Sequence, residues 1–299
     1  MGQYSHLPME WRHRSWSNWD YVTSVAKQVK ALANGVLDNN PPSIGIICGS
    51  GLGSLPEQLE SRTAIPYAAI PGFPIPTVPG HKGELVLGVL SGKQVLCMAG
   101  RFHIYEGHPV AQCVLPIRLM KALGVHTLLI TNAAGAINRS FKIGDLMLIK
   151  DHIAPPLLTL QNPLHGPNDA RLGPRFISMS AAYDPQLREV VKGAAKETGI
   201  TLQEGIYFMA GGPQYETPAE CRMLALLGVD AVGMSVGHET VAARHCGLRV
   251  VAFSLITNMA NLDSEAGVEG DLHAEVLQAG KEGAATAAAL VKAFLARLN

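Results

Sequence analysis

The sequence predicts a single α/β domain, with a central mixed β-sheet flanked by helices. Apolar runs of strand length recur along the chain, and helical patterns lie between several of them, which favours a largely buried sheet covered by helices. The chain has 299 residues, of which 47% are apolar and only 16% charged, so one large core is expected. We expect an N-terminal extension over 1–20, rich in Trp and His, and one domain over 21–299.

The elements are expected in the following order. A helix around 20–36 leads through DNNPPS into the first strand at 43–48. Residues 109–123 carry a helical pattern that Pro116 should kink or shorten. Thr217 as N-cap, Pro218 at the first helical position and a terminal Gly228 predict a helix over 217–227. The further strand-like runs are 84–90, 93–99, 126–131, 145–150, 205–210, 230–235 and 248–257, and an Ala-rich helix is expected over 272–297.

The segment 151–176 stands apart from these elements. It holds five prolines and shows little periodicity. A loop of that length in a compact domain is typical of a functional segment or an interface.

Composition excludes several classes of function. Lys+Arg and Asp+Glu are both 24 and no basic stripe stands out, so nucleic acid is not expected as a partner. No apolar run approaches the ~18 residues that span a bilayer, and the first twenty residues lack the apolar core of a secretory signal. We therefore expect no membrane association and a cytoplasmic location. The cysteines are odd in number, scattered and mostly within apolar segments, which indicates reduced core residues: Cys48, Cys97, Cys113, Cys221 and Cys246.

Polar residues cluster where strand-like runs end. Ligands of open α/β sheets bind outside the carboxyl ends of the strands, so several such clusters together predict one shared site. The clusters are Ser50, RFHIYE at 101–106, NAAG at 132–135, YE at 215–216, Ser235 and Asn258.

The turn GSGLG, residues 49–53, does not match the motifs for large nucleotides. A dinucleotide fingerprint needs a third glycine where Ser54 stands, and a P-loop needs a lysine that this turn lacks. What remains is a small nest of N–H groups with the Ser50 hydroxyl, sized for a single oxyanion. A tight turn without a ligand is the alternative interpretation.

Arg101 and His103 supply further donors for an anion. The guanidinium is a planar fork that matches phosphate oxygens; an ion pair between Arg101 and Glu106, with a structural histidine, is the alternative. His81 lies in a Gly/Pro loop and is either a flexible ligand contact or an ordinary loop histidine.

Two other chemistries have partial motifs. GMSVG at 233–237 matches the nucleophile elbow of serine hydrolases, and Asp263 or Asp271 and His273 follow in the required order. That interpretation leaves Arg101 and the NAAG segment unexplained. GHETVAARH at 237–245 begins like a zinc motif but has Ala242 in place of the second histidine, so no metal is expected.

Taken together, these segments resemble the trimeric purine nucleoside phosphorylases over about 43–293. The resemblance is carried by ICGSGLG, PGFPIPTVPGHKGEL, GRFHIYEGH, TNAAGAIN, GDLMLIKDHI, NPLHGPND, ETPAECRMLALLGVDAVGMS, ARHCGLRV and FSLITN. It implies an α/β fold around a mixed sheet and the reversible phosphorolysis of purine (2′-deoxy)ribonucleosides in purine salvage. The products are the free purine and (deoxy)ribose 1-phosphate. Orthophosphate is then a co-substrate, no cofactor or metal is required, and the enzyme is a homotrimer.

The resemblance also implies the site residues. Phosphate is expected at Ser50, His81, Arg101, His103, Ala133 and Ser235. Purine and ribose are expected at Tyr105, Ala134, Gly135, Tyr215, Glu216, Val232, Met234, Asn258 and His273, with Phe176 supplied by the neighbouring subunit. The catalytic roles are expected for Asn258, His103 and Glu216.

The chemistry of these residues suits the reaction. Cleavage of the N-glycosidic bond builds positive charge on the ribose and negative charge on the purine, and phosphate is the nucleophile. Asn258 can donate to N7, while its carbonyl accepts from a 6-oxopurine edge. Glu216 can accept from N1–H, so the Glu–Asn pair favours hypoxanthine and guanine over adenine.

The chain departs from the usual family pattern at four places. It reads MSVGHE where MSTVPE is usual, Ala136 stands where Gly is common, and Tyr215 is often Phe. The stretch between Asn258 and His273 is one residue longer than in similar chains. These departures leave open whether xanthosine or adenosine is also accepted.

Overall fold

The computed structural model describes residues 15–49, 52–77, 82–263 and 271–298. The predicted phosphate contacts Ser50 and His81 lie outside the described residues.

One mixed sheet of nine strands forms the centre of the described chain, in the order β2-β3-β4-β1-β5-β8-β7-β6-β9. Strand β9 also pairs with β5, so the strands from β5 to β9 close into a ring. The strands are β1 (Ile44–Cys48), β2 (Glu60–Pro66), β3 (Glu84–Leu90), β4 (Lys93–Ala99), β5 (Thr127–Ala136), β6 (Leu146–Ile153), β7 (Leu202–Met209), β8 (Ala231–Gly233) and β9 (Arg249–Met259).

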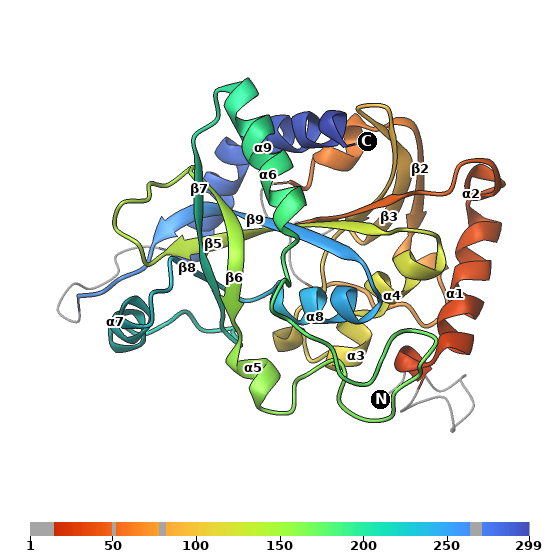
Figure 1. The fold of residues 1–299 in the computed structure, drawn as a ribbon, viewed down its shortest axis with the longest axis horizontal. Coiled ribbons are helices and arrows are strands. Elements are labelled where there is room, and N and C mark those ends of the chain that lie inside the picture. The colour runs from red at the N-terminus through yellow and green to blue at the C-terminus, as the bar shows by residue number, and fades with distance from the viewer. Residues whose placement is uncertain (1–14, 50–51, 78–81, 264–270, 299) are drawn as a thin grey trace.

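Helices cover both faces of this sheet (Figure 1). The helices are α1 (Trp19–Leu32), α2 (Val36–Asn39), α3 (Val110–Cys113), α4 (Leu115–Ala122), α5 (Pro155–Leu158), α6 (Pro185–Thr198), α7 (Pro218–Leu226), α8 (Gly237–His245) and α9 (Leu272–Arg297). A short 3-10 turn, η5 (Ile104–Glu106), follows the loop after β4.

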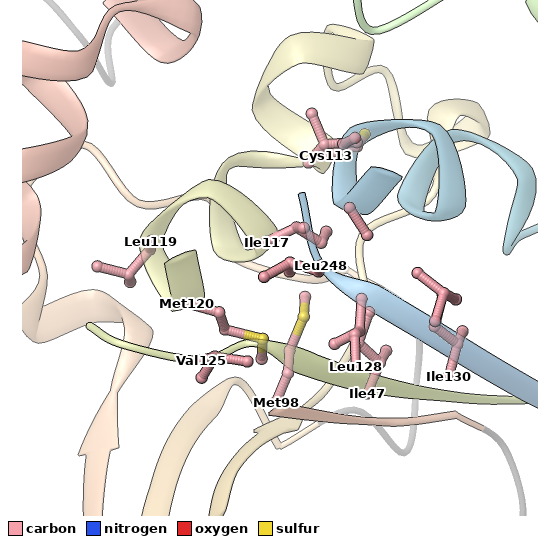
Figure 2. Close-up of a cluster of buried hydrophobic side chains, with 14 of the residues drawn as sticks. Ile47, Met98, Cys113, Ile117, Leu119, Met120, Val125, Leu128, Ile130 and Leu248 are labelled. Atoms are coloured by element: carbon pink, nitrogen blue, oxygen red, sulfur yellow. The ribbon is translucent and has the colours of Figure 1, made fainter. Parts of the chain in front are cut away.

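Strand alternation divides the core between the two faces. Ile47 of β1 packs in the cluster that includes α1, α4 and α8, whereas Ile46 and Cys48 pack in the cluster that includes α6 and α9. Figure 2 shows Ile47 with Met98 and Leu128 of the neighbouring strands, covered by α4. The strands are therefore fixed in register by burial on both sides.

Strand β5 connects the open part of the sheet to the ring. Its first residues, 127–130, pair with β1, whereas Gly135 and Ala136 pair with β8 on the same edge. Its other edge pairs with β9 over the whole length of the strand. The NAAG segment therefore lies within a long strand, where the sequence predicted the end of a short one.

The predicted α/β class is confirmed, and the five cysteines are buried and unpaired. The predicted helix over 109–123 divides at Val114 into α3 and α4, with Pro116 in the first turn of α4. Strand β2 was not predicted, because its first three residues are polar and exposed at the sheet edge. In the part of the chain that the structure describes, no helix is long and apolar enough to cross a membrane.

Candidate active site

The turn after β1 meets the loop after β4 at the edge where both strands end. The Gly49 N–H donates to Thr131 Oγ1 at 3.1 Å. A methyl group on Gly49 would lie 2.3 Å from the Thr131 carbonyl oxygen and 2.7 Å from Arg101 Nη1. The first glycine of GSGLG is therefore required for close approach of three segments.

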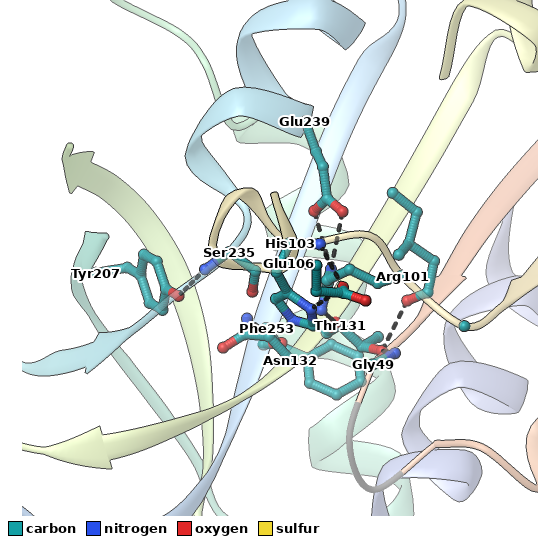
Figure 3. A network of polar contacts seen from close by, with 12 residues as sticks. Gly49, Arg101, His103, Glu106, Thr131, Asn132, Tyr207, Ser235, Glu239 and Phe253 are labelled. Atoms are coloured by element: carbon teal, nitrogen blue, oxygen red, sulfur yellow. Dashed lines mark hydrogen bonds and ion pairs between the residues drawn. The ribbon is translucent and has the colours of Figure 1, made fainter. Parts of the chain in front are cut away.

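Arg101 is fixed by a buried carboxylate from a distant part of the chain. Its Nε and Nη2 donate to the two oxygens of Glu239 at 2.8 and 3.0 Å, and Nη1 donates to the Thr131 carbonyl at 2.9 Å (Figure 3). Both side chains are at most 2% exposed. Burial alone would raise the pKa of Glu239, but the charge and hydrogen bonds of Arg101 outweigh it and hold this pKa below its ordinary value. The alternative pairing of Arg101 with Glu106 is wrong.

His103 is oriented by Glu106. The carboxylate oxygen Oε1 of Glu106 lies 3.0 Å from His103 Nδ1 and accepts the His103 backbone N–H at 2.8 Å. The other oxygen, Oε2, accepts the N–H and hydroxyl of Thr77 at 2.6 and 2.7 Å. The His103 ring also stacks on Tyr105, with centroids 4.6 Å apart.

The protonation of this pair follows from its contacts. Burial opposes ionisation of Glu106, but the bonds from His103 and Thr77 outweigh it and lower its pKa to about 2. Burial lowers the pKa of His103, against the opposite influence of Glu106. A neutral ring that donates through Nδ1 to an ionised carboxylate presents Nε2 as an acceptor, suited to the hydroxyl of a monoprotonated oxyanion.

Ser235 is held at the start of α8 by a strained turn. Its N–H donates to the Tyr207 hydroxyl at 3.2 Å, and its carbonyl accepts the Gly237 N–H at 3.0 Å. Between them, Val236 has φ 76° and ψ −53°, a γ-turn geometry that is strained for a β-branched residue. A methyl group on Gly233 would lie 3.0 Å from the Ala133 carbonyl oxygen, so the chain leading to Ser235 runs against Ala133.

A second group of predicted residues gathers across the ring of strands. Gly135 pairs with Val232 in β8 and with Asn258 in β9. A methyl group on Gly135 would lie 3.0 Å from Asn258 Nδ2, and the Thr257 hydroxyl lies 3.3 Å from Asn258 Oδ1. Asn258 is therefore positioned by Gly135 of β5 and by Thr257 of its own strand β9.

Tyr105 and Met234 both lie close to Gly212, in the loop after β7. A methyl group on Gly212 would lie 2.6 Å from Met234 Sδ and 2.9 Å from Tyr105 Cδ1. Because Tyr105 also stacks on His103, this pair lies between the Arg101–Ser235 group and the end of β7. Ala134, the strand neighbour of Gly135, is buried.

Tyr215 and Glu216 lie in the loop before α7. That helix begins as predicted: Thr217 Oγ1 accepts the Glu220 N–H at 3.2 Å, and the Glu220 side chain accepts the Thr217 N–H at 2.7 Å. Burial raises the pKa of Glu216, which is half-buried. A cavity of about 310 Å³ begins at this pair and extends between α5 and α7, lined also by Phe208, Met209, Pro155 and Met223.

Two predicted residues lie at the margin of this arrangement. His273 is exposed in the first turn of α9, where its backbone N–H donates to Asp271 at 3.0 Å. Phe176 projects from the proline-rich loop with 88% of its surface exposed. Neither side chain is brought against Arg101 or Asn258 by a contact within the described residues.

Comparisons with known proteins show the family of this chain. Residues 43–296 match the model of the phosphorylase superfamily. The purine nucleoside phosphorylase of Bos taurus is 51% identical over 245 residues, 81% of this chain and 84% of the bovine protein. Purine nucleoside phosphorylase 1 of Bacillus subtilis is 46% identical over 258 residues, 86% of this chain and 92% of that protein. The chain belongs to the purine nucleoside phosphorylase family.

Solved structures show the same fold. Schistosoma purine nucleoside phosphorylase in complex with hypoxanthine superposes with a TM-score of 0.89 at 45% identity, covering 95% of this chain and 99% of the other. Its complex with guanosine gives 0.87 at 44% identity, covering 95% and 98%. The chain is therefore a purine nucleoside phosphorylase by family, an enzyme that transfers a pentosyl group in the phosphorolysis of purine nucleosides.

The serine hydrolase alternative has no support in the site of this phosphorylase. Ser235 does lie between a strand and a helix, but its backbone N–H donates a hydrogen bond to the Tyr207 hydroxyl. Asp271 accepts the backbone N–H groups of His273 and Ala274, and over the described ranges no hydrogen bond joins Ser235 to a histidine.

Sequence reasoning missed Glu239 and Tyr207. Glu239 occurs in the sequence analysis only as part of an incomplete zinc motif, and the mixed polar and apolar residues around it give no local signal of a buried partner. Tyr207 lies in a strand that reads as ordinary core, and nothing in its local sequence indicates that its hydroxyl holds the Ser235 backbone. In the described parts of the chain, no group of three His, Cys, Asp or Glu side chains is arranged to hold a metal ion.

Proposed function

We propose that this phosphorylase acts on 6-oxopurine nucleosides, inosine and guanosine, in the cytoplasm. Two residues carry the proposal: the carboxylate Glu216, which lines the cavity beside α7, and the buried amide Asn258, which lies against Gly135. The amide offers a donor for N7 and the carboxylate an acceptor for N1–H. Adenine has no hydrogen on N1, and its 6-amino group is a donor, so a buried acceptor would be left unpaired.

Orthophosphate is proposed as the nucleophile and no cofactor as a requirement. Arg101, His103, the Ala133 backbone and Ser235 would hold the anion below the sugar, with Ser50 and His81 joining them. Phosphate oxygen forms the new bond to C1′ while the C1′–N9 bond breaks and its electron pair leaves with the purine. Asn258 would stabilise that departing charge, and fixed donors would supply proximity and orientation.

The ribose would lie on Tyr105 and Met234, which meet between the two groups of contacts. Ala134, Gly135, Val232 and Tyr215 would line the purine, and His273 would bind the 5′-hydroxyl. Schistosoma purine nucleoside phosphorylase has been solved with inosine, with guanosine and also with adenosine, so the discrimination by this chain has to be measured.

We also propose a homotrimer. Large apolar side chains are exposed on α5, on the loop that follows it, on α7 and at the C-cap of α7, which is typical of an interface: Leu158, Leu160, Met223, Leu226 and Leu227. Phe176 on the proline-rich loop would then close the nucleoside site of the neighbouring subunit.

A panel of inosine, guanosine, xanthosine and adenosine, each with and without phosphate, tests the function. We expect inosine and guanosine to be cleaved only when phosphate is present, with ribose 1-phosphate formed. Equal turnover of adenosine would refute the 6-oxopurine preference, and cleavage without phosphate would refute phosphorolysis. Labelling of Ser235 by a fluorophosphonate with turnover of esters would restore the hydrolase alternative.

A further inference from the structure

His238 is a buried polar residue that the proposed phosphate contacts leave unused. It is the second residue of α8, three residues after Ser235 and one before Glu239, and its surface is 0% exposed. It stands where the similar family pattern MSTVPE has proline. The imidazole is therefore a feature of this chain that the backbone of the turn does not require.

Neither ring nitrogen of His238 has a hydrogen-bond partner among the described residues. A neutral imidazole carries one N–H donor and one acceptor, and burial of both without partners is costly. Two neighbouring groups of the same turn are bonded: Glu239 to Arg101, and the Gly237 N–H to the Ser235 carbonyl. An unpartnered buried ring at this place fits a ligand that arrives with the reaction.

The charges that act on the His238 ring are those around the proposed phosphate site. Burial chiefly lowers the pKa of His238, to about 4, so the ring is uncharged at neutral pH. Glu239, on the same helix, acts in the opposite direction. Arg101 and His103, from the loop after β4, lower the pKa further. An oxyanion held by these two residues brings negative charge near the ring and favours its protonation.

We propose that His238 is a further phosphate-binding residue: its ring donates a hydrogen bond to the anion held by Arg101, His103 and Ser235, and takes up a proton from solvent as the anion binds. The inference rests on the proposed phosphate site. No covalent bond changes in this step. The proline of the usual pattern can supply neither the donor nor the proton.

Sulfate is the probe for the test, because it binds as an oxyanion and does not itself titrate near neutral pH. Its binding is measured by calorimetry at pH 6.5 in two buffers that differ in ionisation enthalpy, which gives affinity and proton uptake together. The proteins are the full chain and the variants His238→Leu, His238→Gln and His245→Gln. His245 is the matched control, a buried histidine at the far end of α8 with one unpartnered nitrogen.

We expect His238→Leu to bind sulfate about tenfold more weakly, since it loses a hydrogen bond to a charged group. His238→Gln keeps an N–H donor but has no site for the proton, so it should bind within about threefold of the parent chain and lose the proton uptake. His245→Gln should match the parent chain in sulfate affinity and in proton uptake. If His238→Leu fails to fold, His238→Pro replaces it, because proline is tolerated in the first turn of a helix.

The inference is overturned if the folded Leu or Pro variant binds sulfate as the parent does, if His238→Gln takes up the same number of protons, or if the parent binds no sulfate. Steady-state kinetics then test whether the substitution affects phosphate binding alone. The KM for phosphate should rise in His238→Leu while the KM for inosine stays unchanged, and equal changes in both would also overturn it. Failure of the parent chain to cleave inosine with phosphate refutes the proposed function instead, since sulfate binding is measured without turnover.

Discussion

The two halves of the candidate site are built differently. The anion half, around Arg101, His103 and Ser235, is buried, and each of its side chains or backbone groups is bonded to a neighbour within the chain. The base half combines the buried Asn258 of β9 with Tyr215 and Glu216, which lie on a loop beside a cavity, and Tyr215 is 39% exposed. The described groups of the anion half are held in place by bonds within the chain, whereas the base half is partly open to solvent. Phosphate, a small ion of fixed shape, suits the first design, and a set of related nucleosides suits the second.

The largest expected effect is on stability, when the partner of Arg101 in the anion half is removed. Glu239→Ala leaves a buried guanidinium without its counter-charge, and we expect a loss of about 3–5 kcal/mol in the free energy of unfolding. Chemical denaturation measures it. Glu84→Ala, which breaks the part-exposed pair of Glu84 with Arg62, is the control and should cost less than about 1 kcal/mol. Equal losses in the two variants would show that the Arg101 pair does not hold the anion half together.

Asn258 tests the base half through chemistry rather than stability. Asn258→Ala removes the donor proposed for N7, and kcat for inosine should fall about 10²- to 10³-fold. The kcat for guanosine should fall by the same factor, because hypoxanthine and guanine present the same N7. Steady-state rates measure the change, with the melting temperature as a check on folding. A rate equal to that of the parent chain would refute the role given to Asn258.

Phe176 tests whether closure of the base half comes from another subunit. In the proposed homotrimer Phe176 is buried against the neighbouring subunit, so Phe176→Ala should raise the KM for inosine about tenfold, following the free energy of burying such a side chain. The KM for phosphate should stay within about twofold, because Arg101, His103 and Ser235 are held by contacts within one chain. Ile143→Ala removes an exposed apolar side chain elsewhere and is the matched control. A change confined to phosphate would contradict the division between the halves.

The smallest expected effect near neutral pH is a change in kcat/KM that depends on Glu216. Burial raises its pKa, so the carboxyl is protonated at a higher pH than an ordinary glutamic acid and then no longer accepts from N1–H. We expect kcat/KM for inosine to fall about tenfold per pH unit below this raised pKa. Glu216→Gln should be slow at every pH and should lack this acid limb. An acid limb that persists in Glu216→Gln must belong to another group.

The parts of the site that are local in sequence could be predicted. Arg101 and His103 lie in one motif directly after a strand. The helix cap at Thr217 is specified by the four consecutive residues 217–220. The parts that depend on long-range pairing could not. Glu239 lies 138 residues from Arg101, and the contact between Gly135 and Asn258 exists only because β5 and β9 pair in that register.

The same limit applies to the fold. Strand β2 was missed because an exposed edge strand needs no apolar alternation over its whole length. Strand β5 was predicted too short, because the small residues of NAAG carry little strand propensity and are held there by partners on both sides.

Strand β5 also fixes the spacing of the two proposed substrates. Thr131, which binds Arg101, and Gly135, which contacts Asn258, lie four residues apart on one continuous strand, a separation of about 13 Å. That length cannot be adjusted by side-chain substitution, and a one-residue insertion would reverse the faces of everything beyond it. A change in the size of nucleoside accepted is therefore expected from the segments around the purine pocket, while the spacing between Thr131 and Gly135 stays constant.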